Sequence, residues 1–199
     1  MAPVNLDRNL RLSRRISKQI HPWLFGEAAL PSFENTRFGM NNKDTSERLI
    51  GVISDTHNLV RPEAIDALRG VELILHAGDI CKPHVLETLN SIAPVITVRG
   101  NNDKDQWAGK LPVWEVVRVG VVSIYMIHNL KEIDITPSTA GFQVVVSGHS
   151  HKPFVEERSG TLYVNPGSAG PKRFSLPICL AHLRVDGKRV NAQVIHLPV

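Results

Sequence analysis

The sequence predicts an α/β (α+β) protein built as a two-sheet β-sandwich flanked by helices. Between residues 49 and 98, short apolar runs alternate with helical patterns. Later in the chain, apolar runs are paired across glycine-containing turns. Polar side chains directly follow several of these runs. The first pattern favours parallel strands, the second favours hairpins, and the third indicates where a ligand would bind.

The first part of this region reads as strand, helix, strand, helix, strand. Leu49–His57 is a short apolar run, rich in β-branched residues, that ends in an acid, a spacer and a histidine. Such a run suits a buried strand better than a helix. Pro62 opens a helix that ends at Gly70, and the elements expected next are a strand over 71–75, a helix over 83–89 and a strand over 95–98. At this spacing the strands pair in parallel through right-handed crossovers.

The second part reads mainly as hairpins. Three pairs of apolar runs flank turn residues: 113–119 with 121–127, 154–157 with 162–164, and 177–185 with 189–197. Asp186-Gly187 is a strong hairpin signal. One further strand is expected over 143–146, and Pro137 limits any helix before it to a short piece. We expect an antiparallel half that packs as a second sheet against the parallel half.

Residues 1–48 differ from the rest in charge. The net charge of the 199 residues is +4, and residues 1–48 hold eight Lys/Arg against five Asp/Glu. We expect a basic N-terminal extension over 1–48, flexible or peripheral, and one folded domain over 49–199. A targeting peptide, a subunit contact and a translation start at Met40 remain alternatives. Because most of the charge lies in the extension, nucleic acid is not expected as a partner of the domain.

The composition predicts a cytoplasmic protein. It is 42% hydrophobic and 21% charged, which is ordinary for a globular chain. No apolar run approaches the roughly 20 residues of a membrane span, and no secretory h-region is present, so no membrane partner is expected. Cys81 and Cys179 form no disulfide framework and no zinc pattern, and both are expected as buried, reduced thiols. A homo-oligomer is left open.

Possible metal ligands follow the expected strands in five separate segments. They are Asp55, His57, Asp79, Asn101, His128, His149 and His151. On an extended backbone, Asp55 and His57 would project to the same side. A carboxylate beside an imidazole can chelate a divalent metal. Each residue taken alone is more often a structural or surface residue, but the repetition at five strand ends favours a metal site.

The order of these residues resembles the calcineurin-like metallophosphoesterase superfamily, most closely its small YfcE-type phosphodiesterases. The matching motifs are Asp55-Thr56-His57, Gly78-Asp79, Gly100-Asn101-Asn102-Asp103, His128, Gly148-His149-Ser150-His151 and Asn165-Pro166-Gly167-Ser168. The resemblance covers about residues 49–197. It implies the metallophosphoesterase fold, a β-sandwich flanked by helices, in agreement with the architecture read from the residues themselves.

The resemblance also implies two divalent metal ions. The first would be held by Asp55, His57 and His151. The second would be held by Asn101, His128 and His149. Asp79 would bridge the two ions and would form the catalytic set together with Asn101 and His149.

Mixed oxygen and imidazole ligands fit Mn²⁺, Fe, Ni²⁺ or Zn²⁺ better than Ca²⁺. Among these ions we expect Mn²⁺, with Fe, Ni²⁺ or Zn²⁺ as alternatives. The implied activity is that of a phosphodiesterase, a metal-dependent hydrolase of phosphoric esters. It would hydrolyse a small phosphodiester, such as a nucleotide or cyclic nucleotide, by means of a metal-bridging hydroxide.

Two residues depart from the superfamily pattern. Asn102 stands where many members have a histidine, and an amide cannot act as an acid near pH 7. The YfcE-type branch also often lacks that histidine. Asn129 stands where glycine usually follows the metal-binding histidine, which puts the position of His128 in question. Two other residues have open roles: Asp103 would orient the Asn101 loop or cap a turn, and Arg173 would attract a phosphate or lie in a solvated turn.

Two rival functions remain. One is a catalytically weak or inactive scaffold of the same fold, like the related-looking retromer subunit, and Asn102 and the N-terminal extension favour it. The other is a phosphomonoesterase or protein phosphatase that uses the same metals. Metal content separates the scaffold from the enzymes, and relative rates on mono- and diesters separate the two enzymes.

Overall fold

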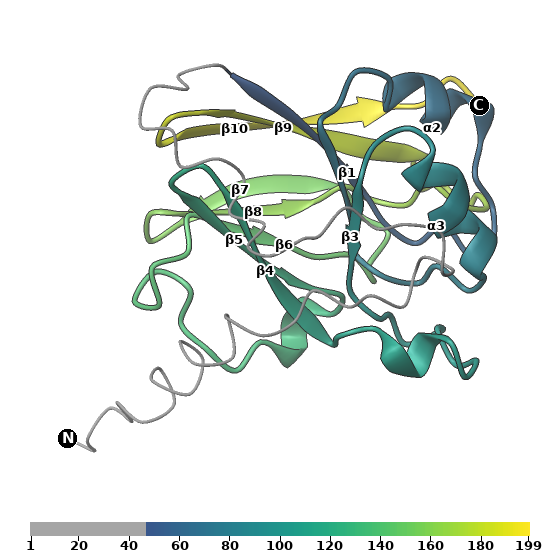
Figure 1. The fold of residues 1–199 in the computed structure, drawn as a ribbon, viewed down its shortest axis with the longest axis horizontal. Helices are drawn as coiled ribbons and strands as arrows, with labels where there is room; N and C mark the ends of the chain where they lie inside the picture. The colour runs from purple at the N-terminus through teal and green to yellow at the C-terminus, as the bar shows by residue number, and fades with distance from the viewer. Residues whose placement is uncertain (1–46) are drawn as a thin grey trace, which may run out of the picture. The chain divides into compact units, whose positions relative to one another are not determined.

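Residues 47–199 are described by the computed structural model, and they form two five-stranded sheets (Figure 1). The predicted extension over 1–48 lies outside this range except for its last two residues, so it stays a prediction. The first sheet contains β1 (Arg48–Ile53), β2 (Leu73–His76), β3 (Val95–Thr97), β9 (Cys179–Asp186) and β10 (Arg189–His196). The second contains β4 (Trp114–Val119), β5 (Val122–Ile127), β6 (Val144–Val146), β7 (Phe154–Arg158) and β8 (Thr161–Asn165).

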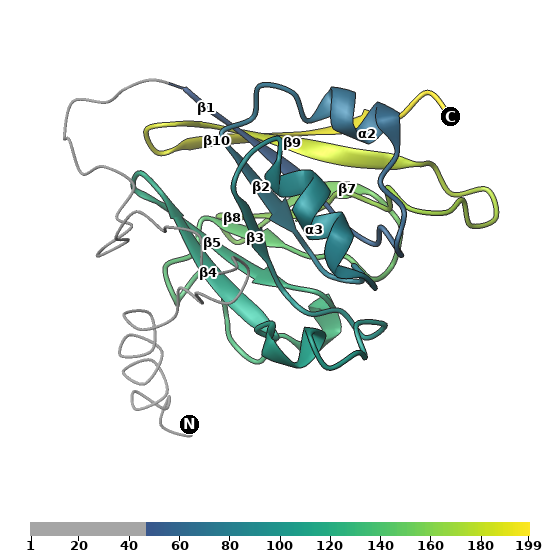
Figure 2. The ribbon, with the colours of Figure 1, turned by 45° about the vertical axis from the view of Figure 1, so that its right-hand side comes forward.

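The first sheet has the strand order β10-β9-β1-β2-β3. β1, β2 and β3 pair in parallel, as predicted, whereas β9 joins β1 in antiparallel register and brings the C-terminal hairpin back to the first strand. Helices α2 (Pro62–Ala67) and α3 (Pro83–Asn90) lie on one face of this sheet (Figure 2). Ala64 and Leu68 pack there against Ile53 and Ile74. Burying these apolar side chains is what holds the helices on the sheet.

The second sheet has the order β4-β5-β6-β8-β7 and is not the antiparallel sheet that the sequence predicts. Of the three predicted hairpins, β4–β5 and β7–β8 are present and antiparallel in this sheet, whereas the third, β9–β10, is antiparallel but belongs to the first sheet. However, β5, β6 and β8 run parallel to one another. Local turn signals reveal only the hairpins, because a parallel neighbour comes from a distant part of the chain. Two 3₁₀ turns, Ala108–Lys110 and Leu130–Glu132, lie in the connections before β4 and β6.

The inner faces of the two sheets form the main core. Val52 and Leu75 from the first sheet, and Ile124 and Val146 from the second, belong to one buried cluster. The predicted β-sandwich with helices outside is therefore confirmed, with both helices on the first sheet. Each sheet holds three parallel strands, and the loops after five of these six strands carry the predicted ligands.

Within residues 47–199, no helix has the length and apolar character that crossing a membrane requires. The cytoplasmic location and the oligomeric state stay predictions of the sequence.

Candidate metal centre

The loops that follow β1, β2 and β6 hold five predicted ligands on left-handed backbone. The φ angles are 53° at Asp55, 44° at His57, 58° at Asp79, 67° at His149 and 57° at His151. The extended backbone predicted for the first two is wrong, because β1 ends before either of them. A left-handed conformation costs an L-residue about 1–2 kcal/mol. The surrounding structure must hold such conformations in place, as is common at functional sites.

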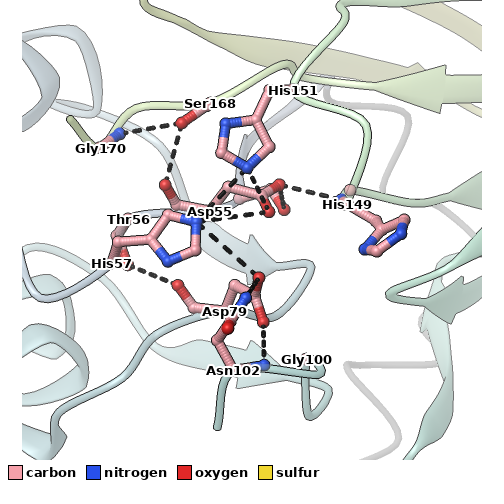
Figure 3. A network of polar contacts seen from close by, with 12 residues as sticks. Asp55, Thr56, His57, Asp79, Gly100, Asn102, His149, His151, Ser168 and Gly170 are labelled. Carbon is pink, nitrogen blue, oxygen red and sulfur yellow. Dashed lines mark hydrogen bonds and ion pairs between the residues drawn. The ribbon is translucent and has the colours of Figure 1, made fainter. Parts of the chain in front are cut away.

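Asp55, His57 and His151 form one group, each offering a ligand atom within 4.8 Å of the others (Figure 3). The Nε2 atoms of His57 and His151 are 3.4 Å apart, and His151 Nε2 is 3.2 Å from Asp55 Oδ1. Asp55 Oδ2 accepts hydrogen bonds from Ser54 Oγ at 2.6 Å and from the His149 backbone N–H at 3.0 Å. Asp55 Oδ1, in contrast, is buried without a hydrogen-bond partner.

Asp79 and His128 form a second group, which also includes Asp55. His128 Nε2 is 3.5 Å from Asp79 Oδ2 and 3.1 Å from Asn101 Oδ1. The other ring nitrogen, Nδ1, donates a hydrogen bond to the Ala77 carbonyl at 2.7 Å. This bond fixes the ring orientation and leaves Nε2 to face the two oxygens, the arrangement usual for a metal-binding histidine.

His149 and Asn101 are the two exposed residues among the seven predicted ligands. The Nδ1 atom of His149 is 2.9 Å from Asn101 Oδ1, and its ring meets the edge of the His128 ring at 5.2 Å between centroids. Figure 3 shows its imidazole on the other side of the Asp55 carboxylate from the rings of His57 and His151. The structure thus brings all seven residues to one place, with His149 joined to the rest mainly through Asn101.

The charges of this cluster are set by burial and by its own hydrogen bonds. Burial alone would raise the pKa of Asp79, but hydrogen bonds from His128 and Asn102 hold it well below its usual range. Burial would lower the pKa of His128, yet the Asp79 carboxylate raises it overall. Burial lowers the pKa of His57, against the opposing effect of Asp79 and Asp55. Asp79 is therefore an anion, and His57 is a neutral ring.

Asp103 joins two of the loops. Its buried carboxylate accepts hydrogen bonds from the backbone N–H groups of Asp79 at 3.0 Å, Cys81 at 2.7 Å and Gly100 at 2.7 Å. The bond to Gly100 closes its own turn, while the other two reach the loop after β2. Asp103 therefore has contacts of both kinds considered above. The bond from Gly100 caps a turn, and the bonds from Asp79 and Cys81 hold the loop that carries a predicted ligand.

Asn165 and Ser168 tie the loop after β8 to the same centre. Asn165 Nδ2 donates to the Gly148 carbonyl at 2.7 Å, and Ser168 Oγ donates to the Asp55 carbonyl at 2.9 Å. Their motif is among those that carry the resemblance to the superfamily, but its residue types alone indicate only a turn. In the structure both side chains are buried, which the residue types do not reveal.

Three glycines let the loops approach one another. Gly78 has a φ of +92°, which glycine adopts without steric cost. Gly148 is needed for space, because a Cβ there would overlap Ser54 Oγ and lie 2.8 Å from Asp55 Oδ2. A Cβ at Gly100 would overlap the backbone N and side chain of Asp79.

A sequence profile of the calcineurin-like phosphoesterase superfamily domain matches residues 49–188. The chain belongs to this superfamily.

Relatives and structures agree with this assignment. The chain is 39% identical over 158 residues to a probable metallophosphoesterase of Methanothermobacter thermautotrophicus, covering 74% of this chain and 91% of that one. It is 35% identical over 91 residues to phosphodiesterase YfcE of Escherichia coli K12, covering 42% and 50%. The crystal structure of Chaetomium thermophilum Vps29 has the same fold, with a TM-score of 0.62, 23% identity and coverage of 75% and 97%. The predicted resemblance and fold are confirmed, and the chain is a metal-dependent phosphoesterase.

The donor set of this calcineurin-like phosphoesterase fits divalent metal ions. Asp55 Oδ1 and the Nε2 atoms of His57 and His151 face one another, and a buried carboxylate oxygen without a hydrogen-bond donor is costly. A cation between the three would satisfy them. A thiolate is absent from both groups, so the donors are those preferred by borderline divalent metals.

The two departures from the superfamily pattern have local explanations. Asn102 donates from its backbone N to Asp79 Oδ1 at 2.8 Å and from Nδ2 to Asp79 Oδ2 at 2.7 Å, so it contacts the carboxylate expected to bridge the metals. Asn129 has an ordinary φ of −103°, and its side-chain oxygen accepts from Lys131 N at the start of the 3₁₀ turn. Glycine is not needed there, and His128 keeps its place.

Arg173 reaches the centre from the loop before β9. Its Nη2 donates to His57 Nε2 at 3.2 Å, although the side chain is exposed. The same lone pair of His57 would bind a metal, so a bound ion would displace the guanidinium from it. Arg173 then remains beside the site as a cation.

Sequence reasoning missed Cys81. It is only partly buried, and its Sγ lies 3.6 Å from His57 Nδ1, so the prediction of a buried thiol is wrong for Cys81 and right for Cys179. Burial raises the pKa of the Cys81 thiol to about 11, so it stays protonated. The sequence did offer a signal for this contact: Cys81 lies two residues after Asp79, in a loop that carries a predicted ligand.

His76 proves structural. It is fully buried, its Nε2 contacts Thr56 Oγ1 at 3.0 Å, and its Nδ1 accepts from the Gly78 N–H at 3.2 Å. Burial lowers its pKa to about 3, so the ring is neutral. Its ring contacts the loops after β1 and β2 and is not one of the proposed metal ligands.

Proposed function

We propose that this chain is a dinuclear metal-dependent phosphodiesterase that hydrolyses small phosphodiesters. Asp55, His57 and His151 hold the first ion. Asn101, His128 and His149 hold the second. Asp79 bridges them, and Mn²⁺ is the proposed native metal.

The observation that carries this proposal is the unpaired, buried oxygen of Asp55. It points at two imidazole nitrogens, each on a left-handed residue, and no hydrogen bond relieves it. Protein interiors rarely leave a carboxylate oxygen in this state. A cation supplies the missing partner and offsets the repulsion between Asp55 and the nearby anion Asp79.

The chain's own residues fit the hydrolysis of a phosphodiester. Two divalent ions would lower the pKa of a water and neutralise charge on the phosphoryl group. Asp79 stays anionic at neutral pH and is aligned by Asn102. Arg173 offers a guanidinium at the mouth, suited to phosphoryl oxygens. His149 and Asn101 are exposed and lie side by side, with His149 Nδ1 2.9 Å from Asn101 Oδ1, so a substrate could reach both.

The test is hydrolysis of bis(p-nitrophenyl) phosphate with and without Mn²⁺, joined to elemental analysis of the purified protein. We expect Mn²⁺-dependent turnover and about two metal ions per chain, the number a two-metal site requires. Asp79→Asn should lower turnover by at least ~10²-fold, the loss that a misplaced reacting group alone can cause. Asp186→Asn, which changes an exposed carboxylate at the end of β9, is the matched control and should keep wild-type activity and metal. Wild-type turnover in Asp79→Asn would refute the assigned site.

A second candidate is a scaffold of the same fold with little activity. The observation that favours it is that both oxygens of Asp79 already accept hydrogen bonds from Asn102. Protein that binds no metal when supplied with Mn²⁺ would support the scaffold. A phosphomonoesterase is distinguished by p-nitrophenyl phosphate: turnover far faster than that of the diester at equal metal loading would remove the diesterase assignment.

A further inference from the structure

Cys81 lies where the loop after β2 meets the loop after β1. The His57 N–H donates to the Asp79 carbonyl at 2.9 Å, so the two loops run side by side. The Cys81 N–H donates to Asp103 Oδ1 at 2.7 Å, and the backbone φ of Cys81 is +69°. Such a conformation is unfavourable for a residue with a side chain and persists only where the surrounding structure holds it. These backbone contacts therefore fix the Cys81 side chain, with Sγ 3.6 Å from His57 Nδ1.

The contacts of His57 show which of its ring nitrogens carries the proton. Arg173 Nη2 lies 3.2 Å from His57 Nε2. A guanidinium has only hydrogen-bond donors, so Nε2 is the acceptor. An imidazole that accepts at Nε2 is neutral and carries its single proton on Nδ1. The Nδ1–H of His57 therefore faces the sulfur of Cys81.

The thiol of Cys81 is oriented to accept this hydrogen bond. Its own S–H is directed to the Asn102 carbonyl, with Sγ 4.0 Å from the oxygen. The sulfur lone pairs are then left for the His57 N–H, because a thiol sulfur is a weak acceptor as well as a weak donor. Within residues 47–199, His57 Nδ1 has no other hydrogen-bond partner. Cys81 is therefore the described residue that can fix the His57 ring from its Nδ1 side.

His128 shows what such a contact does for another predicted ligand. Its Nδ1 donates to the Ala77 carbonyl at 2.7 Å, and its Nε2 faces Asp79 Oδ2 at 3.5 Å. His57 repeats this arrangement with a sulfur in place of the carbonyl, and its Nε2 lies 3.8 Å from the same Asp79 oxygen. Metal-binding histidines almost always donate their second ring N–H to a partner, which fixes the tautomer and the ring orientation.

We propose that Cys81 is the positioning residue for His57. Its sulfur accepts the Nδ1–H, keeps the proton off Nε2 and turns Nε2 toward the two carboxylates of the centre. The proposal rests on the proposed function, because it takes His57 to be a metal ligand through Nε2. A sulfur is a weaker acceptor than a carbonyl oxygen, so Cys81 should stabilise the His57 ring less than Ala77 stabilises that of His128.

The tautomer can be read from the metal-free protein labelled with ¹⁵N-histidine. Long-range ¹H–¹⁵N correlation spectra tell the ring nitrogens apart, because Nε2 couples to both ring C–H protons and Nδ1 mainly to one. The His57 signals are assigned by their loss in His57→Gln. We expect Nδ1 to be protonated in the wild-type protein. Cys81→Ala removes the acceptor and should give a mixture of tautomers, since the contact with Arg173 is exposed and holds Nε2 weakly.

Cys81→Asn is the rescue variant. Asparagine adopts positive φ more readily than most residues, and its uncharged side-chain oxygen can accept the same N–H. It should restore the wild-type tautomer. Cys179→Ala is the matched control, because it removes the sulfur of a buried cysteine that contacts the Pro177 carbonyl and no predicted ligand. This control should leave the tautomer of His57 unchanged.

Calorimetry with Mn²⁺ measures the consequence for metal binding. Cys81→Ala should weaken Mn²⁺ binding by about 10-fold, the lower end of the cost of losing a group that orients a metal ligand, because sulfur is a weak acceptor. Cys81→Asn should recover most of this loss, and Cys179→Ala should bind Mn²⁺ as the wild type does.

Three results would overturn the assignment of Cys81. They are a proton on Nε2 of His57 in the wild-type protein, a tautomer or an Mn²⁺ affinity that Cys81→Ala leaves unchanged, and an equal loss of affinity in Cys81→Ala and Cys81→Asn. Wild-type protein that binds no Mn²⁺ would refute the proposed function instead. The tautomers of the metal-free variants would then decide by themselves whether Cys81 positions His57.

Discussion

Left-handed backbone occurs in two settings in this fold, at the outer turns and at the metal centre. In the outer turns it is mostly carried by glycines around which a Cβ would meet nothing within 4 Å: Gly70, Gly120, Gly141, Gly160 and Gly187. At the metal centre it is carried mainly by aspartate, histidine, asparagine and cysteine, and Gly78 is the exception. The glycines there, such as Gly100 and Gly148, serve close packing instead.

The difference shows where strain is tolerated. A turn that needs only its shape uses glycine, because glycine adopts positive φ without steric cost. A turn that must also supply a ligand keeps the ligand and accepts the strain. Backbone hydrogen bonds between the loops after β1 and β2 offset it: Asp55 N–H to Gly78, His57 N–H to Asp79 and Asn58 N–H to Ile80, all at 2.9–3.0 Å.

The largest effect should come from filling the packed space. Gly148→Ala would drive a methyl group into Ser54 Oγ and toward Asp55, displacing the His149 loop. We expect Mn²⁺-dependent activity to fall by ~10²-fold or more, since small misplacements at a reacting centre have this cost. Gly109→Ala is the control, because a methyl group there meets nothing within 4 Å and no positive φ is required. Equal activities in the two variants would mean that the approach of the loops is not needed.

A smaller effect should follow from weakening the link between loops. Asp103→Asn replaces a carboxylate that accepts three backbone N–H groups with an amide that can turn a donor toward one of them. We expect Mn²⁺ affinity, measured by calorimetry, to fall by ~10- to 100-fold, as for other groups that orient metal ligands.

Asp105→Asn provides the comparison, since Asp105 is exposed and pairs with Lys82 at 2.9 Å. Its Mn²⁺ affinity should stay within about twofold of wild type, because exposed ion pairs contribute little. A similar loss in both variants would show that net charge, rather than the buried link, governs affinity.

The smallest effect should come from relieving the strain itself. Ser159 has a φ of 51° at an exposed hairpin turn, and Cys81 has a φ of 69° at the metal centre. Changing either to glycine should raise the free energy of unfolding of the metal-free protein by about 0.5 kcal/mol, measured in urea. Only Cys81→Gly should also weaken Mn²⁺ binding, because it removes the Sγ contact with His57. Unchanged metal binding in that variant would make Cys81 a structural residue.

The contrast between outer turns and metal-centre loops also separates the features that could be predicted from the sequence from those that could not. The turns at Gly120 and Gly187 act locally, so both hairpins were predicted correctly. Polar residues at strand ends revealed the seven residues that the structure brings together. The left-handed backbone at Asp55 was missed because it depends on the neighbouring loop after β2. The parallel pairing of β5 with β6, and the contact of Cys81 with His57, depend on contacts between distant segments that hydrophobic periodicity does not report.

Anomalous diffraction from crystals grown with Mn²⁺ tests the two-metal assignment most directly. We expect two manganese peaks, one among Asp55, His57 and His151 and one among Asn101, His128 and His149, with the Asp79 carboxylate between them. A single peak, or peaks bound by other residues, would contradict it.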